Sequence, residues 1–255
     1  MNKLKSLLKN KPKDLLAIYF TAGYPKLEDT TEILLALDQK KVDIIEVGIP
    51  YSDPLADGEV IQRTGSTALK NGMNLDLLFS QLAKVKGKIN APIVLMGYFN
   101  QFLQYGPEFF LKCCYDTGVS GLILPDMPLE VYQKKYKSLF EQYNQTHTFL
   151  ISPQSGKERM LALAEASSGF VYIVSSAATT GAKSDIKDSQ IQYFKTVQAL
   201  NLDKPSLIGF GISSRESYNT ACLYASGAII GSAFLNYLKG ENLKEEVSEF
   251  IDLIR

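Results

Sequence analysis

The feature that most constrains the fold is a regular alternation of short apolar segments with longer amphipathic ones. Eight apolar segments have the length and composition of buried β-strands, at residues 15–22, 42–49, 92–98, 121–127, 148–152, 170–175, 206–212 and 228–232. Helical periods lie between them, at residues 27–39, 101–116, 130–142, 157–166, 189–200 and 215–225. Strands that alternate with helices predict a parallel sheet. Eight such units in 255 residues have the size of one closed (β/α)8 TIM barrel.

The spacing of these segments predicts the domain organisation and two long loops. No linker, charge block or change of composition divides the chain, so we expect residues 1–255 to form a single barrel domain. Strand starts are farthest apart between 42 and 92 and between 170 and 206. This predicts extended loops after strands two and six, at the face where such barrels carry active sites. The Ser-x-x-Glu spacing of Ser213 and Glu216 predicts a capping box and a helix directly after strand seven.

Composition argues against several classes of protein. The 27 basic and 27 acidic side chains leave no net charge, which argues against a nucleic-acid binder. No apolar run approaches the ~18 residues of a membrane span, and the first residues lack the apolar core of a signal peptide. Three Cys without metal-ligand spacing indicate neither a metal site nor a disulfide framework and predict a cytoplasmic location. The single histidine, His147, opens an apolar run and is expected to be structural.

Glu46 is the most informative candidate for a catalytic residue. Side chains alternate between the two faces of a strand, so Ile44, Glu46 and Gly48 are expected to face the barrel interior. A carboxylate in that position is costly unless it is paired, hydrated or used in chemistry. One interpretation is a hydrogen-bonded structural residue. The other is a general acid/base whose pKa is raised by an apolar environment.

The segment after this strand carries two further carboxylates, Asp53 and Asp57, among two prolines and a glycine. Asp57 stands just before a helical period, so it is either the N-cap of that helix or a member of an acid–base pair with Glu46. Asp53 precedes Pro54 and fits a turn. Two carboxylates close to each other are what a reaction with proton transfers at two ends of one substrate requires.

Glycines at the ends of the last three strands suggest an anion site. Gly181 follows strand six, Gly209 and Gly211 end strand seven, and Gly231 precedes Ser232 at the end of strand eight. Glycine permits close backbone approach, and phosphate in these barrels often binds to the loops after strands seven and eight. The pattern therefore predicts a phosphate-bearing small-molecule substrate.

The run Ser-Asp-Pro-Leu-Ala-Asp-Gly at 52–58 is highly specific to one family, and here the chain resembles the tryptophan synthase α subunit. The resemblance covers nearly the whole chain. It continues through Thr-Ala-Gly-Tyr-Pro at 21–25, Leu-Met-Gly-Tyr-Phe-Asn at 95–100, Leu-Pro-Asp-Met-Pro at 124–128, Gly-Phe-Gly-Ile-Ser-Ser at 209–214 and Gly-Ser-Ala at 231–233.

The resemblance implies a carbon–carbon lyase of tryptophan biosynthesis, which cleaves indole-3-glycerol phosphate to indole and glyceraldehyde 3-phosphate without a cofactor of its own. Glu46 matches the family's acid/base, and Asp57 the carboxylate that binds the indole N–H. The positions that match substrate and phosphate contacts are Tyr98, Asn100, Asp126, Thr180, Gly181, Gly211, Gly231 and Ser232. The implied partner is a pyridoxal-phosphate β subunit in an α2β2 heterotetramer, with Asp53 and Pro54 at the shared interface.

The sixth loop departs from the family pattern Ser-Arg-x-Gly-x-Thr-Gly. Ser176 replaces the arginine, and Ala178 replaces a glycine that adopts positive φ at low cost. Because this loop normally closes over the site, an alternative is a catalytically weak subunit that mainly binds and activates the β subunit. A third interpretation is another phosphate-binding barrel of the pathway, an isomerase or the indole-glycerol-phosphate synthase. The synthase needs a lysine at a strand end, and none of the predicted strand ends has one.

Overall fold

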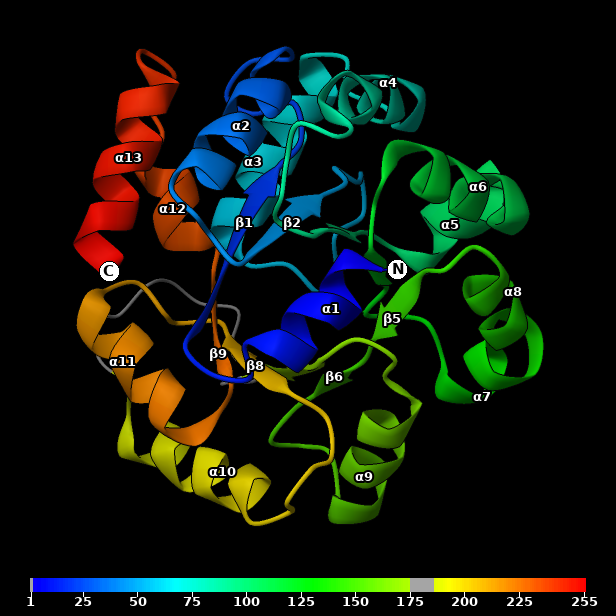
Figure 1. Ribbon diagram of the computed structural model, residues 1–255, viewed down its shortest axis with the longest axis vertical. Helices are drawn as coiled ribbons and strands as arrows, with labels where there is room; N and C mark the ends of the chain where they lie inside the picture. The colour runs from blue at the N-terminus through cyan, green and yellow to red at the C-terminus, as the bar shows by residue number, and fades with distance from the viewer. Residues whose placement is uncertain (1, 175–185) are drawn as a thin grey trace.

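The computed structural model describes residues 2–174 and 186–255, which form a parallel sheet wrapped into a barrel (Figure 1). The strands are β1 (Leu15–Thr21), β2 (Ile44–Gly48), β3 (Ile93–Met96), β4 (Gly121–Ile123), β5 (Thr146–Thr148), β6 (Leu150–Ile151), β7 (Val171–Val174), β8 (Ser206–Gly209) and β9 (Gly227–Ile230). Neighbouring strands pair in parallel, in the order β5-β4-β3-β2-β1-β9-β8-β7-β6.

The two ends of this order belong to one stretch of chain. β5 and β6 are separated only by Phe149; β5 pairs with β4 and β6 pairs with β7. Together they act as one barrel strand, which closes an eight-stranded ring and confirms the predicted (β/α)8 barrel. This strand begins at Thr146, whereas the sequence pattern predicted a start at residue 148. The pattern missed the first residues because Thr146 and His147 are polar, although both are fully buried.

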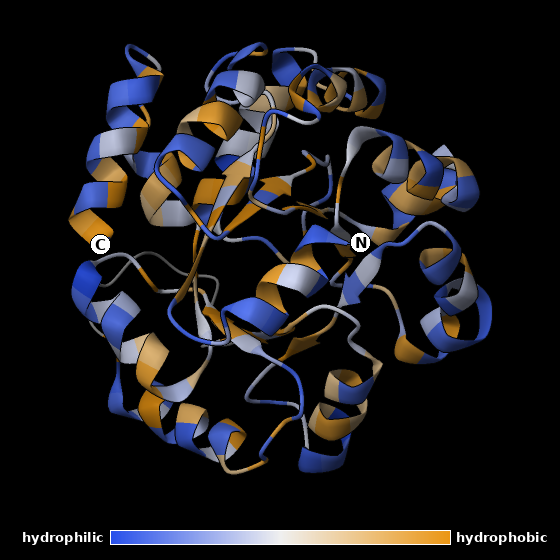
Figure 2. Ribbon diagram, viewed as in Figure 1, coloured by the Kyte–Doolittle hydropathy of each residue, from blue (hydrophilic) through white to orange (hydrophobic). Residues whose placement is uncertain are grey.

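Helices surround the barrel on all sides in Figure 1. They are α2 (Asp29–Gln39), α3 (Glu59–Lys70), α4 (Leu75–Val85), α5 (Phe99–Tyr105), α6 (Pro107–Thr117), α7 (Leu129–Val131), the π-helical turn η1 (Tyr132–Tyr136), α8 (Lys137–Gln142), α9 (Lys157–Ala166), α10 (Asp188–Gln198), α11 (Arg215–Tyr224), α12 (Ser232–Tyr237) and α13 (Leu243–Ile254). Figure 2 shows apolar strands inside a ring of helices with polar outer faces. Every residue of β1 and β2 is buried, as expected for strands covered on both faces.

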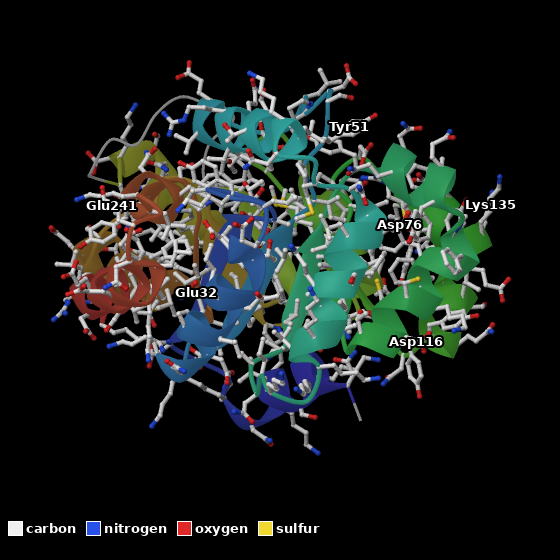
Figure 3. All side chains as sticks on the ribbon, turned by 90° about the horizontal axis from the view of Figure 1, so that it is seen from above. Glu32, Tyr51, Asp76, Asp116, Lys135 and Glu241 are labelled. Atoms are coloured by element: carbon white, nitrogen blue, oxygen red, sulfur yellow. The ribbon has the colours of Figure 1, made fainter. Side chains whose placement is uncertain are left out.

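One further helix, α1 (Lys3–Asn10), lies across the amino-terminal end of the barrel (Figure 1). Its Leu4 and Leu8 are buried. The Asn2 side-chain oxygen caps the helix by accepting from the backbone N–H groups of residues 4 and 5. The Asn2 amide nitrogen donates to the carbonyls of Ser120 and Asn144, both at 2.7 Å. The chain thus covers this end of the barrel, and Figure 3 shows Tyr51 at the opposite end.

Local sequence explains where the elements differ from the predicted pattern. The added residues after strand two form an extended segment, 49–58, and then an additional helix, α3. The predicted helix at 101–116 is divided into α5 and α6, because Gly106 adopts a φ of 90° and Pro107 follows it. Helix α11 is the next element after β8, the seventh strand of the predicted pattern, as expected. Its cap, however, is Ser214 and not Ser213. The sixth strand of the predicted pattern is β7. The loop extension predicted after it falls on residues 175–185, outside the described residues.

None of the helices in residues 2–174 and 186–255 is long and apolar enough to cross a membrane.

Candidate active site

β2 places Glu46 inside the barrel, next to Tyr19 of β1 and Val94 of β3 in register. This agrees with the face predicted by strand alternation. Glu46 is 1% exposed, and neither of its carboxyl oxygens has a hydrogen-bond partner among the described residues. Burial, and secondarily the charge of Asp57, raise the pKa of Glu46 from 4.5 to about 8. A buried carboxyl without partners and with such a pKa is suited to take up and release a proton, and a hydrogen-bonded structural role lacks its partners.

Asp57 lies in the segment 49–58, close enough to Glu46 for its charge to raise the pKa of that residue. It is 8% exposed, and burial raises its pKa from 3.8 to about 6, against the lowering effect of a hydrogen bond from the Tyr98 hydroxyl. The same hydroxyl accepts the backbone N–H of Ala56 at 3.0 Å. The N-cap of α3 is Gly58, so the alternative interpretation of Asp57 as a helix cap is wrong. Its carboxyl remains available for chemistry beside Glu46.

Tyr98, Asn100 and Asp126 hold the neighbouring loops together at this end of the barrel. The Tyr98 ring stacks on Tyr51, with ring centroids 4.9 Å apart. The Asn100 amide donates to the Tyr51 hydroxyl at 3.0 Å. Asp126, which follows β4, accepts the backbone N–H of Phe99 at 2.8 Å. The loops after β2, β3 and β4 are thereby connected, which fixes the segment that carries Asp57.

The glycines at the ends of β8 and β9 lie on adjacent strands. Gly211 follows β8 with a φ of 79°, in the left-handed region that favours glycine. Gly231 precedes α12, and Ser232 is the first residue of that helix. Backbone N–H groups at such turns suit an oxyanion. Thr180 and Gly181, predicted as a further part of this group, lie outside the described residues, as do Ser176 and Ala178.

The outer part of the segment 49–58 is exposed to solvent. Asp53 is exposed, Pro54 is partly exposed and Leu55 is 93% exposed. The Ser52 hydroxyl donates to the Asp53 carboxylate at 2.5 Å. One short segment therefore carries the buried carboxyl of Asp57 and, two residues earlier, the exposed apolar side chain of Leu55.

Three residues of this end of the barrel were not singled out from the sequence. Tyr19 and Tyr172 are 6% and 5% exposed, and burial raises the pKa of both hydroxyls, with smaller contributions from Glu46 and Asp57. Gln101 donates to the carbonyl of Pro50 at 2.9 Å and accepts the N–H of Tyr98 at 3.0 Å. The signal for Tyr19 was available, because it lies inside an otherwise apolar strand; Gln101 required the folded arrangement of two loops.

Two other features of the described chain bear on where a site lies. Residues 2–174 and 186–255 contain no group of His, Cys, Asp and Glu that suits a metal ion. A hollow of about 460 Å³ lies at the amino-terminal end, beside Lys3, Asp38 and Asp43. Its carboxylates are already engaged: Asp38 accepts backbone N–H groups at 2.8 Å, and Asp43 binds Lys11 at 2.6 Å. This hollow adjoins residues that precede β2 and β3, at the end of the barrel opposite the segment that carries Asp57.

A parallel (β/α)8 barrel with two buried carboxyls of raised pKa at the active-site face defines an enzyme of acid–base chemistry. The family model described as "Tryptophan synthase alpha chain" matches residues 5–254, and the chain belongs to this family.

Individual relatives and solved structures agree with this membership. The tryptophan synthase alpha chain of Christiangramia forsetii is 48% identical over 255 residues, which cover 100% of this chain and 99% of the relative. That of Flavobacterium psychrophilum is 46% identical over 254 residues, 100% of each chain. A mutant tryptophan synthase alpha-subunit from Pyrococcus furiosus superposes with a TM-score of 0.86 at 31% identity, covering 95% of this chain and 98% of that one. The aminoacrylate-bound tryptophan synthase of M. tuberculosis gives 0.85 at 28% identity and full coverage of both.

Proposed function

We propose that this protein is the α subunit of a tryptophan synthase, a lyase that cleaves indole-3-glycerol phosphate to indole and glyceraldehyde 3-phosphate. The observation that carries the proposal is the pair Glu46 and Asp57. Both carboxyls are buried at the active-site face of the barrel, and Glu46 has no hydrogen-bond partner among the described residues. Membership of the family supports the lyase over the catalytically weak subunit that the departures at Ser176 and Ala178 suggested.

The reaction divides proton transfer and charge stabilisation between the two carboxyls. When C3 of the indole ring takes up a proton that the protonated Glu46 carboxyl helps to deliver, positive charge develops at the ring nitrogen, and the Asp57 carboxylate binds that N–H. Glu46 then removes the proton of the hydroxyl on the side-chain carbon next to C3. The C–O bond becomes the aldehyde C=O, the bond from that carbon to C3 breaks, and its electron pair returns to the ring. One proton enters at C3 and one leaves the hydroxyl, so the step balances.

The different pKa values of the two carboxyls support this division. The pKa of about 8 leaves Glu46 mostly protonated near neutral pH, so that it is able to donate a proton first and to accept one afterwards. The pKa of about 6 leaves Asp57 mostly ionised, which suits the binding of a positively charged indole ring. Tyr98, Asn100 and Asp126 hold the loops that position Asp57.

We assign the phosphate of the substrate to the backbone N–H groups near Gly211, Gly231 and Ser232, together with Thr180 and Gly181 of the sixth loop. Support comes from the neighbouring ends of β8 and β9 and from the positive φ of Gly211. A chain without net charge provides no general field for an anion, so local N–H groups must supply the binding.

The proposed partner is the β subunit, which carries pyridoxal phosphate and receives indole, in an α2β2 assembly. Asp53 and Pro54 are assigned to this interface, which the exposure of the neighbouring Leu55 supports. Because the same segment carries Asp57, contact with the partner is expected to influence the active site directly. We expect the complex to act in the cytoplasm, as the cysteine pattern predicts.

The deciding experiment is steady-state cleavage of indole-3-glycerol phosphate with and without the β subunit. The wild-type chain should release indole, and Glu46→Gln should abolish release while it still activates the partner. Asp53→Ala should weaken activation of the β subunit more than substrate binding. Failure of the wild type to cleave in the complex would contradict the lyase assignment. If the wild type cleaves slowly or not at all, the double variant Ser176→Arg with Ala178→Gly tests the cause. A gain of cleavage rate in this variant would assign the low activity to the sixth loop.

A further inference from the structure

Tyr19 connects the two halves of the proposed active site. It lies on β1 with Glu46 as its register partner on β2, so both side chains project into the barrel at the same level. Its hydroxyl oxygen lies 2.0 Å from the position that a Cβ atom on Gly48 would take. On its other side, a Cβ on Gly231 would stand 3.2 Å from Cδ1 of the Tyr19 ring. The ring therefore extends from the proposed phosphate loop toward the carboxyl pair.

The Tyr19 hydroxyl is a neutral hydrogen-bond donor at physiological pH. Burial, followed by the charges of Asp57 and Glu46, raises its pKa well above 10, against the lowering effect of a hydrogen bond with the Thr21 side chain. Gly48 is two residues beyond Glu46 on the same strand face, so the hydroxyl lies on the carboxyl-terminal side of Glu46 within the barrel. Since both Glu46 oxygens lack a partner among the described residues, a substrate oxygen between the two groups satisfies both.

We propose that the Tyr19 hydroxyl is a further catalytic group, which donates a hydrogen bond to the substrate hydroxyl oxygen from which Glu46 takes the proton. This inference rests on the proposed function. As the proton passes to Glu46 and the C–C bond breaks, negative charge develops on that oxygen before the aldehyde C=O is complete. The Tyr19 O–H stabilises this charge and keeps its own proton, so the proton and electron balance of the cleavage is unchanged.

Tyr172 is the competing candidate. It projects from β7, and its hydroxyl lies 2.2 Å from the Cβ position of Gly209. Burial raises its pKa well above 10 as well, with smaller contributions from Glu46, Tyr19 and Asp57. β1 is paired with β2, whereas β7 lies across the barrel from it, so Tyr19 is the tyrosine on the strand that adjoins Glu46.

The test is Tyr19→Phe in the complete complex with the β subunit, assayed for cleavage of indole-3-glycerol phosphate. The kcat is expected to fall at least about tenfold with KM changed less than about threefold, since the lost bond is strongest in the transition state. The affinity for indole-3-propanol phosphate, which lacks the reacting hydroxyl, should stay unchanged. Tyr193→Phe is the matched control, because Tyr193 on α10 has a buried hydroxyl without a partner among the described residues.

Each other outcome has a defined meaning. A kcat within about twofold of wild type overturns the inference but leaves the lyase assignment intact. Equal losses of kcat/KM and of affinity for the analogue reduce Tyr19 to a packing residue and also overturn it. A larger loss in Tyr172→Phe than in Tyr19→Phe transfers the donor role to Tyr172. If the wild-type complex does not cleave the substrate, the proposed function fails, and this inference fails with it.

Discussion

The hydroxyl oxygen of Tyr19 occupies space that any side chain at position 48 would need, 2.0 Å from the ideal Cβ position on Gly48. Cζ and Cε2 of the same ring lie 2.5 and 2.7 Å from that position, so the conflict involves the rigid ring and not a flexible chain end. Gly48 adopts extended backbone within β2, so its requirement for glycine comes from this close approach. The two residues are therefore one unit in the wall of the barrel.

Gly48→Ala should accordingly displace Tyr19 and cost about 1–3 kcal/mol of unfolding free energy, the usual cost of inserting a methyl group into a packed interior. The rate of substrate cleavage should also fall, because the displaced Tyr19 ring lies on the strand next to Glu46. The matched control is Gly65→Ala in α3, where no heavy atom lies within 4 Å of the added Cβ. That change should raise stability by about 0.5–1 kcal/mol. Equal effects of both variants in urea unfolding would show that the clash at Gly48 is relieved without cost.

Glu46→Gln should increase stability at alkaline pH. The pKa of Glu46 is about 8 in the folded chain and 4.5 as its ordinary value. Below pH 4.5 the carboxyl is protonated in both states and has no effect. As pH rises from 4.5 to 8, only the unfolded state ionises freely, so folding loses about 1.4 kcal/mol per pH unit in this interval. The variant lacks this loss and should exceed wild type by an amount on the order of a few kcal/mol at pH 8.

Urea unfolding at pH 5, 6.5 and 8 checks this dependence. Glu32→Gln, on the exposed side of α2, is the control for the loss of a carboxyl at the surface. The expected result is a difference between Glu46→Gln and wild type that grows with pH by more than any change in the control. A constant difference for Glu46→Gln would contradict the raised pKa and weaken the acid–base role.

His147 should make stability depend on pH in the opposite direction. It is fully buried, its ring stacks on Tyr132 at 4.8 Å between centroids, and neither ring nitrogen has a partner among the described residues. Burial lowers its pKa from 6.5 to about 3. The neutral ring is therefore tolerated above pH 6.5, and stability is lost as pH falls from 6.5 toward 3, at about 1.4 kcal/mol per unit.

His147→Leu should remove this loss. Because His147 is the single histidine, the comparison of wild type and variant between pH 7 and 5 isolates its contribution from the opposing effects of Glu46 and Asp57. The unfolding free energy of wild type relative to the variant should fall as pH goes from 7 to 5. A difference that stays constant over this interval would mean that the ring is able to bind a proton in the folded protein.

The sequence predicted those features that depend on local pattern. Buried strands appear as apolar runs, and the alternation within β2 was enough to place Glu46 inside the barrel. The helix α1 was not predicted, because its two buried leucines become meaningful only when the barrel end beneath them exists. The contact of Asp57 with Tyr98 joins loops from different strands, which no local pattern contains. The interpretation of Asp57 as a helix cap was wrong for the same reason. The local sequence predicted a helix start there, but in the structure the Asp57 side chain binds the Tyr98 hydroxyl.

Asn2→Ala should destabilise the protein more than the loss of an ordinary helix cap. Asn2 is 5% exposed, and its side chain caps α1 while it donates to two carbonyls that precede β4 and β5. Loss of a cap costs about 1 kcal/mol, and loss of the two hydrogen bonds donated by the amide adds about 0.5–1.5 kcal/mol each. We therefore expect a loss of roughly 2–4 kcal/mol.

Asn74→Ala is the matched control, because Asn74 is an exposed N-cap whose side chain accepts the N–H of Leu77 at 3.0 Å. It should lose the cap and one exposed hydrogen bond to the Gly72 carbonyl, about 1 kcal/mol in all. Differential scanning calorimetry of the two variants and wild type measures both losses under one condition. The expected order places Asn2→Ala well below Asn74→Ala in unfolding free energy, since only Asn2 connects a helix to the barrel. Equal losses would mean that α1 contributes to the barrel end through Leu4 and Leu8 alone.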